Sequence, residues 1–430
     1  MSELAGESEP RSEVTGPLAG VQVIDFTSAW AGPMTTRSLA FLGATVIKIE
    51  SPVTMDSWRG SVHGAAPDRF PDLVPGERPY NRNSYFNTQN HDKLSVALNL
   101  KMPGAADVVY ALAETSDVVI ANFSPGVLDR LGLGYDRLSA INPRIITVEM
   151  PAFGSGGPMT HHVGMGMTME AACGMTGLMG YGDGKPVPTG TAYMDPIGGL
   201  HGAAAVLTAL VDRERTGVGQ RIEVAQTEAA MHWIGDELIA AAEGGEPWQA
   251  CGNRVRDAAP HDAYPCAGTD EWVAVAVFDD DQWRALCAEI GRNGLVDDPR
   301  FATSDARWQN QDDLADVIGA WTSGQDKSAV AQRLQRAGVP AAPVRNGADI
   351  WGCPGLREIG FLATLDHPEA GTHDYPGLAY RLERTPGAVR RAAPRFGEHN
   401  DHVLREVLGF SAERVEELRA SGAVADRPAS

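Results

Sequence analysis

Two cations and an aromatic ring in the first third of the chain could bind an anionic ligand together. Lys101 and Arg130 can contact phosphate groups, and the guanidinium of Arg130 can donate two parallel hydrogen bonds to one phosphate. Phe123, in the segment NFSPG, offers an aromatic face in the same region. Each residue taken alone could also be a surface charge or a core ring, and Arg130 could pair with an acid near a helix end.

Asp195, in the segment TAYMDPIGG, carries a carboxylate that could act as a nucleophile. From spacing alone a helix N-cap is the commoner role, because Asp followed by Pro is a frequent helix start. Gly198 and Gly199 follow closely and are predicted to belong to the substrate pocket, where their backbone N–H groups near a helix start could stabilise a developing oxyanion. The spacing leaves both roles of Asp195 open.

Several common active-site motifs are absent from the sequence. There is no phosphate-binding P-loop and no H-E-x-x-H zinc motif, and Ser155 lacks the preceding glycine of a nucleophile elbow because Phe153 stands there. The adjacent pair His161 and His162 rarely binds one metal ion. The five cysteines show no C-x-x-C spacing, which argues against a disulfide framework or structural zinc. We therefore expect no metal and no redox cofactor.

The composition is that of an ordinary globular α/β enzyme, with 43% hydrophobic and 21% charged residues. The formal net charge of −20 disfavours nucleic-acid and anionic-membrane partners. The acidic start, residues 1–16, is predicted to be a flexible tail. We expect no apolar run to reach the roughly 18 residues that are needed to span a bilayer. A soluble protein in the reducing cytoplasm is the prediction.

The elements that must position these residues are short apolar strands alternating with helices. Strands are predicted at Val21–Asp25, Thr45–Ile49, Asp117–Ala121, Ile145–Met150 and Arg221–Val224. Strands that are apolar on both faces indicate a parallel sheet flanked by helices, a Rossmann-like arrangement. Ligands bind such sheets at the carboxyl ends of the strands. We therefore expect the site in the loops 27–33, 50–52, 122–126 and 151–158.

The pattern beyond the sheet predicts a second, smaller α/β domain inserted into the large one. The large domain is predicted at 17–243, a linker or lid at 244–260, the small domain at 261–345, and a C-terminal segment returning to the large domain at 346–430. The stretch 159–180 is rich in methionine and glycine. Flexible thioethers there could form a substrate-pocket wall or simply fill an irregular core.

Several segments, in order along the chain, resemble family III CoA-transferases, which include formyl-CoA transferase, carnitine CoA-transferase and α-methylacyl-CoA racemase. They are LAGVQVIDFTSAWAGPMTTRSLAFLGATVIKIE, NHDKLSVALNLK, NFSPGVLDRLGL, INPRIITV, TAYMDPIGG, RERTGVGQRIEV and RFGEHNDHVLREVLG. The resemblance extends from about Leu18 to Val424 and implies an enzyme that binds an acyl-CoA donor and a carboxylic acid acceptor.

The resemblance implies a role for individual residues. Asp195 would be the nucleophile, which forms a mixed anhydride and then an aspartyl-CoA thioester. The adenine and phosphates of CoA would be held by Leu98, Lys101, Asn122, Phe123 and Arg130. The family also implies a homodimer of two interlocked rings, with the site between the large domain of one chain and the small domain of its partner.

Two residues that are expected in the substrate pocket, Trp30 and Met165, depart from family members. Trp30 stands where formyl-CoA transferase has a glutamine, which suggests a larger and less polar acyl group, because an unpaired polar ligand is costly to bury. Met165 stands where the racemase has a basic histidine, and methionine cannot be a general base. CoA transfer is therefore favoured over the alternatives, which are an α-methylacyl-CoA racemase, an intramolecular CoA-transferring isomerase and an acyl-CoA-binding regulator.

Overall fold

The computed structural model describes residues 16–181, 184–245 and 250–429. Within these residues the chain divides into two compact units. The described residues of unit 1 lie within Met1–Met175, Thr189–Leu238 and Arg357–Ser430, and those of unit 2 lie within Thr176–Pro188 and Ile239–Leu356. The tail predicted at 1–16 lies outside the described residues except for Gly16. The segment predicted as a linker or lid, 244–260, belongs to unit 2 where it is described.

Unit 1 is built on a six-stranded parallel sheet with the strand order β3-β2-β1-β4-β5-β6. The strands are β1 (Gln22–Asp25), β2 (Thr45–Glu50), β3 (Lys93–Ala97), β4 (Val118–Ala121), β5 (Ile146–Glu149) and β6 (Arg221–Glu223). This is the strand order of the Rossmann fold, in which ligands bind where the order reverses, between β1 and β4. The predicted parallel sheet is confirmed, and β3 was not predicted.

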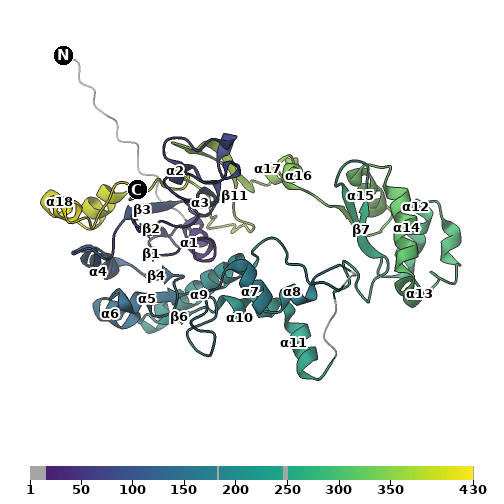
Figure 1. Ribbon diagram of the computed structural model, residues 1–430, viewed down its shortest axis with the longest axis horizontal. Helices are drawn as coiled ribbons and strands as arrows, with labels where there is room; N and C mark the ends of the chain where they lie inside the picture. Colours follow the sequence, from purple (N-terminus) through teal and green to yellow (C-terminus); the bar gives the residue numbers. More distant parts are fainter. Residues whose placement is uncertain (1–15, 182–183, 246–249, 430) are drawn as a thin grey trace, which may run out of the picture. The chain divides into compact units, whose positions relative to one another are not determined.

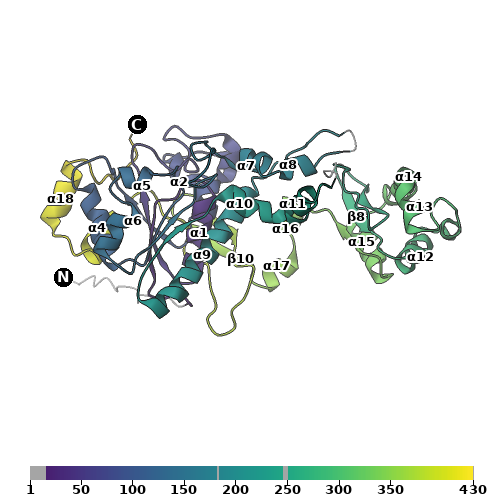
Figure 2. The same cartoon turned by 90° about the horizontal axis from the view of Figure 1, so that it is seen from below.

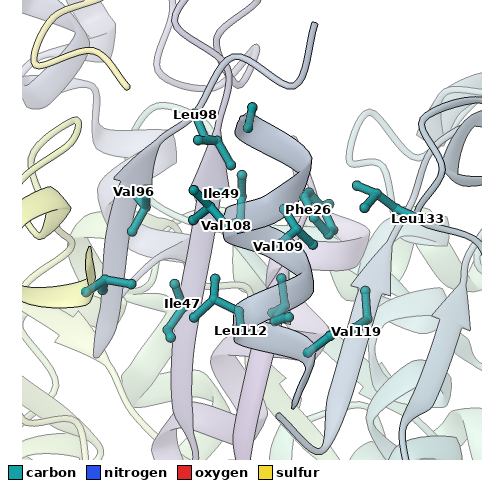
Figure 3. Close-up of a cluster of buried hydrophobic side chains, with 14 of the residues drawn as sticks. Phe26, Ile47, Ile49, Val96, Leu98, Val108, Val109, Leu112, Val119 and Leu133 are labelled. Atoms are coloured by element: carbon teal, nitrogen blue, oxygen red, sulfur yellow. The ribbon is translucent and has the colours of Figure 1, made fainter. Parts of the chain in front are cut away.

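Helices cover both faces of this sheet, as Figures 1 and 2 show. On one face α4 (Ala105–Thr115), α6 (Tyr135–Ile141) and α18 (Ala412–Ala420) pack onto alternate strand residues, and Figure 3 shows Leu112 and Val108 of α4 against Ile47. On the other face α1 (Ala31–Phe41) and α9 (Met194–Thr216) pack onto the remaining strand residues. Most residues of β1 to β5 are thus buried on one face or the other, which is why these strands are largely apolar in sequence, whereas no residue of the edge strand β6 is buried.

The helix α9 is long and apolar enough, by length and composition alone, to cross a membrane, which the sequence analysis did not anticipate. Half of its most apolar window is buried (50%), and it packs against α1. The glycines of this helix allow close packing, because a Cβ on Gly199 would lie 2.7 Å from the carbonyl oxygen of Ala31. A core helix of a globular unit has the same properties.

Shorter elements complete unit 1 and its borders with unit 2. They are η1 (Pro67–Arg69), η2 (Pro71–Leu73), α2 (Pro79–Arg82), α3 (Ser84–Gln89), α5 (Val127–Arg130), α7 (Gly166–Ala172), α8 (Met175–Leu178), α10 (Gln226–Met231), η3 (His232–Ile234), α11 (Gly235–Ala242), α17 (Pro354–Glu358), β10 (Leu362–His367), β11 (Gly371–Pro376) and the π-helix η5 (His402–Val407).

Unit 2 contains an antiparallel sheet of three strands in the order β7-β8-β9, with helices packed on one face around the buried Trp283. Its strands are β7 (His261–Pro265), β8 (Trp272–Ala276) and β9 (Ala341–Pro343). Its helices are α12 (Asp280–Glu289), η4 (Asn293–Val296), α13 (Ser304–Gln309), α14 (Gln311–Thr322), α15 (Lys327–Arg336) and α16 (Gly347–Trp351).

Candidate active site

Two cavities lie at the carboxyl ends of the strands of unit 1. Cavity A, of about 500 Å³, is lined by residues that follow β1, β2, β3 and β4, among them Phe26–Ser28, Ser51–Asp56, Leu98–Lys101 and Phe123. Cavity B, of about 510 Å³, is lined by Trp30, Trp58, residues 122–125, residues 162–167 and Asp195, among others. Phe123 lines both cavities. The site therefore lies at the edge of the sheet where ligands of Rossmann-ordered folds bind.

Three of the five residues proposed to hold CoA line cavity A. These are Leu98, which is fully buried, together with Lys101 and Phe123. Arg130 does not line the cavity, but its Nη1 lies 3.3 Å from the position that a Cβ on Gly126 would take, at the start of α5. Lys101 and Arg130 are both exposed, and neither has an acidic partner within the described residues. Both cations remain available for a phosphate group.

Asn122 lines cavity B and not cavity A, and its side chain holds a neighbouring loop. Its Nδ2 donates to the carbonyl oxygen of Ser28 at 2.8 Å, and its Oδ1 accepts from the N–H of Ser28 at 2.9 Å. The amide thus joins the loop after β4 to the loop after β1. Its observed contacts assign Asn122 a positioning role in the loop that precedes α1.

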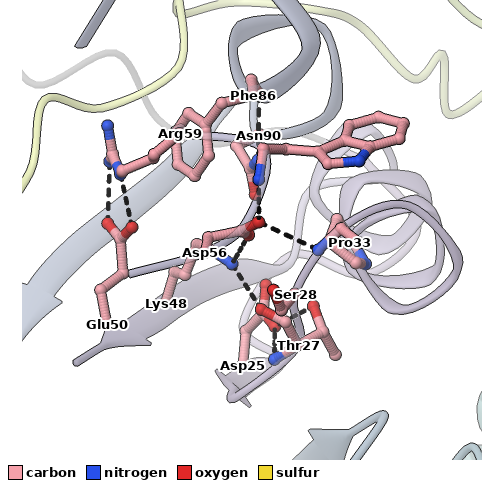
Figure 4. Close-up of polar contacts among 12 residues, drawn as sticks. Asp25, Thr27, Ser28, Pro33, Lys48, Glu50, Asp56, Arg59, Phe86 and Asn90 are labelled. Atoms are coloured by element: carbon pink, nitrogen blue, oxygen red, sulfur yellow. Dashed lines mark hydrogen bonds and ion pairs between the residues drawn. The ribbon is translucent and has the colours of Figure 1, made fainter. Parts of the chain in front are cut away.

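The loop from Thr27 to Trp30 is fixed by buried charged side chains, shown in Figure 4. Thr27 donates its hydroxyl and its N–H to Asp25 Oδ1, at 2.5 and 2.8 Å, and its carbonyl accepts from Lys48 Nζ at 2.6 Å. The N–H of Ala29 donates to Asp56 Oδ1 at 3.0 Å. Ala29 has a φ of 63°, a conformation that non-glycine residues adopt only when their surroundings enforce it. These contacts determine the direction in which α1 begins.

These charges belong to a buried cluster of three ion pairs, which is electrically balanced. The pairs are Asp25–Lys93 at 3.0 Å, Lys48–Asp56 at 3.1 Å and Glu50–Arg59 at 2.5 Å. Although burial acts to raise the pKa of the Asp25 carboxyl, the charges of Lys93 and Lys48 overcome it and lower that pKa. Removing one member would leave its partner buried and unpaired, at a cost of about 3–5 kcal/mol.

Asp195 lies in cavity B as the second residue of α9, so the prediction that it might be the helix N-cap is wrong. Burial raises the pKa of its carboxyl to about 6, although hydrogen bonds from the backbone N–H groups of Ala31 and of Asp195 itself oppose that shift. Ala31 is the first residue of α1, and a helix N-terminus favours negative charge. Among the residues that line cavity B, all of which are described, no lysine or arginine accompanies this carboxylate.

Gly166, at the start of α7, contacts the Asp195 carboxylate directly. A Cβ built on Gly166 would lie 2.2 Å from Asp195 Oδ2 and 2.2 Å from the Cβ of Ala192. No residue larger than glycine fits there without moving the carboxylate. This role is not evident from the sequence, in which Gly166 is one glycine of the methionine- and glycine-rich stretch 159–180.

Gly198 and Gly199 do not line either cavity, contrary to the prediction that they belong to the substrate pocket. Gly198 is the fifth residue of α9, beyond the first turn whose N–H groups lack partners within a helix. A Cβ on Gly198 would lie 2.9 Å from the side chain of Gln226 in α10, so its role is close helix packing. The backbone N–H groups that lower the pKa of the Asp195 carboxyl are those of Ala31 and of Asp195 itself.

The remaining wall of cavity B is aromatic and thioether-rich. Trp30 and Trp58 both line it, with ring centroids 5.4 Å apart. Met165 and Met167 also line it, and the predicted pocket residues Trp30 and Met165 are therefore brought together with Asp195. Trp58 was missed by sequence analysis, because it lies in a loop between β2 and β3 without a recognisable motif.

The fold and the site define an α/β enzyme. The partly buried carboxylate of Asp195 lies in cavity B, and the exposed cation Lys101 lines cavity A. The chain belongs to CoA-transferase family III, which matches residues 18–400. It is 32% identical to a formyl-CoA:oxalate CoA-transferase of Rhodopseudomonas palustris strain HaA2, over 96% of this chain and 98% of that protein. It is also 32% identical to the succinyl-CoA–L-malate CoA-transferase beta subunit of Chloroflexus aurantiacus, over 94% and 98%.

Solved structures agree with this family assignment. A CAIB/BAIF family protein from Brucella suis matches with a TM-score of 0.81 and 29% identity, over 92% of this chain and all of that one (100%). A hypothetical protein from Mycobacterium tuberculosis matches with a TM-score of 0.74 and 28% identity, over 91% and 99%. The resemblance that the sequence motifs predicted is confirmed. The protein is a transferase, and acyl-CoA and carboxylate substrates fit its family.

Proposed function

We propose that this protein transfers CoA from an acyl-CoA donor to a carboxylic acid, with Asp195 as the nucleophile. The observation that carries the proposal is the environment of the Asp195 carboxylate in cavity B. Burial raises its pKa to about 6, so the carboxylate is largely ionised at pH 7 and yet is weakly solvated. A carboxylate in this state is available for attack on a thioester carbonyl.

The proposed reaction proceeds through two covalent intermediates. An oxygen of Asp195 attacks the thioester carbonyl, the C–S bond breaks, and CoA thiolate leaves behind a mixed anhydride. The thiolate then attacks the Asp195 carbonyl carbon, releasing the donor acid as a carboxylate and forming an aspartyl-CoA thioester. The acceptor carboxylate attacks that thioester, and the released thiolate attacks the acceptor's acyl carbon. The new acyl-CoA leaves, and the Asp195 carboxylate is restored.

Other residues of the site would support these steps. The N–H of Ala31, which donates to the Asp195 carboxylate, would stay close to the negative charge that develops when Asp195 is attacked. The unpaired cations Lys101 and Arg130 would bind the phosphates of CoA near cavity A. Phe123, which lines both cavities, would lie beside the path of the CoA chain from one to the other.

Trapping the covalent enzyme tests this function directly. Incubation with acyl-CoA and hydroxylamine should convert the Asp195 side chain to a hydroxamate that peptide mass spectrometry locates. Asp195→Ala should abolish both this label and turnover. Asp212→Ala, which removes another acid of α9 outside both cavities, is the matched control and should keep both. A label on a different residue, or more than a few per cent of activity in Asp195→Ala, would refute the assignment.

The racemase alternative predicts a different outcome. Met165 lines cavity B at the position where that reaction needs a base, and a thioether cannot take a proton from the α-carbon. Incubation of one branched acyl-CoA in heavy water, without an acceptor acid, should therefore introduce no deuterium at the α-carbon.

We further propose that the enzyme works in the cytoplasm as a homodimer of interlocked chains, as the family resemblance implies. The cysteines of the chain are free thiols, which fits a reducing compartment. Light scattering should give twice the chain mass of 45.7 kDa. A monomeric mass for the active enzyme would contradict the dimer.

A further inference from the structure

Cavity B contains almost no charge besides that of Asp195. Of the side chains that line it, all in the described part of the chain, only Asp195 and His162 are ionisable. The ring of His162 packs edge-on against Phe153, with centroids 6.2 Å apart. Cavity A differs, because it contains the exposed Lys101 as well as buried charges. The two cavities therefore suit different parts of a ligand, and only cavity A offers a free cation.

This charge distribution restricts the acids that cavity B can accept. The reacting carboxyl group of donor or acceptor must approach Asp195, so the remainder of the acid lies against the rest of the cavity wall. Against these residues a second carboxylate would lose its hydration, and this chain's part of the wall would supply no lysine or arginine partner. An apolar remainder would instead gain free energy by leaving water and contacting aromatic rings and thioethers.

Trp58 is a part of this wall that its neighbours hold in place. Its backbone N–H donates to Asp56 Oδ1 at 3.0 Å, and the next residue, Arg59, is completely buried in its ion pair with Glu50. The indole lies between two other rings, with centroids 5.4 Å from Trp30 and 5.0 Å from Tyr85. Trp58 is nevertheless only partly buried, so part of the ring is open to a ligand. A ring held in place before binding loses little entropy when a ligand contacts it.

We infer that the enzyme acts on monocarboxylic acids with an apolar or aromatic remainder, and that Trp58 determines this specificity. The inference rests on the proposed CoA transfer through Asp195. The inferred substrates differ from the acids in the names of the two relatives above, oxalate and L-malate, which are dicarboxylates. It also assigns a role to a residue that no sequence motif singled out.

Single-turnover labelling of Asp195 with different thioesters tests the inference. The purified full-length enzyme is mixed with phenylacetyl-CoA, acetyl-CoA or succinyl-CoA in hydroxylamine, and the rate of hydroxamate formation is measured. Phenylacetyl-CoA should label Asp195 about 100-fold faster than succinyl-CoA, because one buried unpaired carboxylate outweighs the gain from a few apolar contacts. Preference for succinyl-CoA would overturn the inference and leave the proposed CoA transfer intact. Absence of label from every thioester would overturn both.

Variants of Trp58 distinguish a specificity role from a structural one. Trp58→Ala should lower the labelling rate with phenylacetyl-CoA about 10-fold and leave that with acetyl-CoA within about 2-fold. Trp58→Phe keeps an aromatic ring and should stay within about 3-fold of the wild type for both. Trp58→Arg adds a cation and should raise the rate with succinyl-CoA at least about 10-fold. Equal loss with phenylacetyl-CoA and acetyl-CoA in Trp58→Ala, with no gain for succinyl-CoA in Trp58→Arg, would show that Trp58 only supports the fold.

Discussion

Replacing Asp195 by Asn should stabilise the folded protein at neutral pH while it removes activity. Burial raises the pKa of this carboxyl from its ordinary value of 3.8 to about 6, against the opposing hydrogen bonds from Ala31 and from its own N–H. The folded protein therefore binds the proton more tightly than the unfolded chain does. Stability that the protonated carboxyl provides at low pH is lost as the pH rises from about 3.8 to about 6. Asn is neutral at every pH and avoids this loss.

The size of the effect follows from the difference in pKa. A shift of about 2 units corresponds to at most about 3 kcal/mol in the free energy of unfolding, once the pH is well above the folded-state value. At pH 5 the carboxyl is ionised in the unfolded chain but still mostly protonated in the folded protein. The free energy of unfolding is then lower than at acidic pH by about 1.5 kcal/mol. The advantage of Asp195→Asn over the wild type should therefore grow by about 1.5 kcal/mol between pH 5 and pH 8.

Urea denaturation of both proteins at pH 5 and pH 8 measures this change. No ligand is added, so titration of the CoA phosphates cannot contribute. Any constant difference between Asn and a neutral carboxyl cancels when the two pH values are compared. Asp212→Asn, which changes another acid of the same helix outside both cavities, is measured in parallel as the matched control. If the advantage of Asp195→Asn is the same at both pH values, the raised pKa of Asp195 is wrong, and so is the argument for a weakly solvated nucleophile.

Three further substitutions test how the site is positioned. Gly166→Ala should lower turnover by about 100-fold or more, because the new methyl group displaces the Asp195 carboxylate by about an ångström. Steady-state kinetics measures this loss, and unchanged CoA binding in calorimetry would exclude misfolding. Asn122→Ala should reduce the free energy of unfolding by about 1–3 kcal/mol in urea, because the N–H and carbonyl of Ser28 lose their partner; no loss would show that water replaces the amide. Arg130→Ala should raise the KM for acyl-CoA about 10-fold at low salt and by less at high salt, because salt screens the contact between the guanidinium and a phosphate. If the rise in KM is the same at both salt concentrations, that contact is wrong.

The sheet was largely predictable because most of its strands are apolar on both faces. β3 was missed, since Lys93 and Ser95 interrupt its apolar pattern. Both side chains are buried, and they interact with acids on other strands: Lys93 pairs with Asp25 of β1, and Ser95 donates to Glu50 Oε1 of β2 at 2.6 Å. A single strand read alone does not reveal such partners. The charged and polar side chains of β3 have their partners on other strands, and these contacts exist only in the assembled sheet.

The site was predictable where its residues directly follow strands. Phe123 was found in this way, because the carboxyl ends of parallel strands meet at one edge. Trp58 and Gly166 come from segments that reach the same edge by irregular paths, and their roles depend on neighbours distant in the sequence. The N–H of Ala31 has no side-chain signal at all. Its only trace in the sequence is that a helix begins soon after β1.

The carboxylates of Asp25 and Asp195 show how one protein gives the same side chain two opposite roles. Both are withdrawn from water, but the lysines around Asp25 lower its pKa, while burial of Asp195 without a lysine or arginine in cavity B raises its pKa to about 6. A cation beside Asp195 would stabilise the carboxylate and make it a poorer nucleophile. The paired Asp25 instead fixes Thr27 in the loop that leads to α1, whose first N–H reaches Asp195. Separating titratable groups by environment in this way is how acidic side chains acquire distinct catalytic and structural roles.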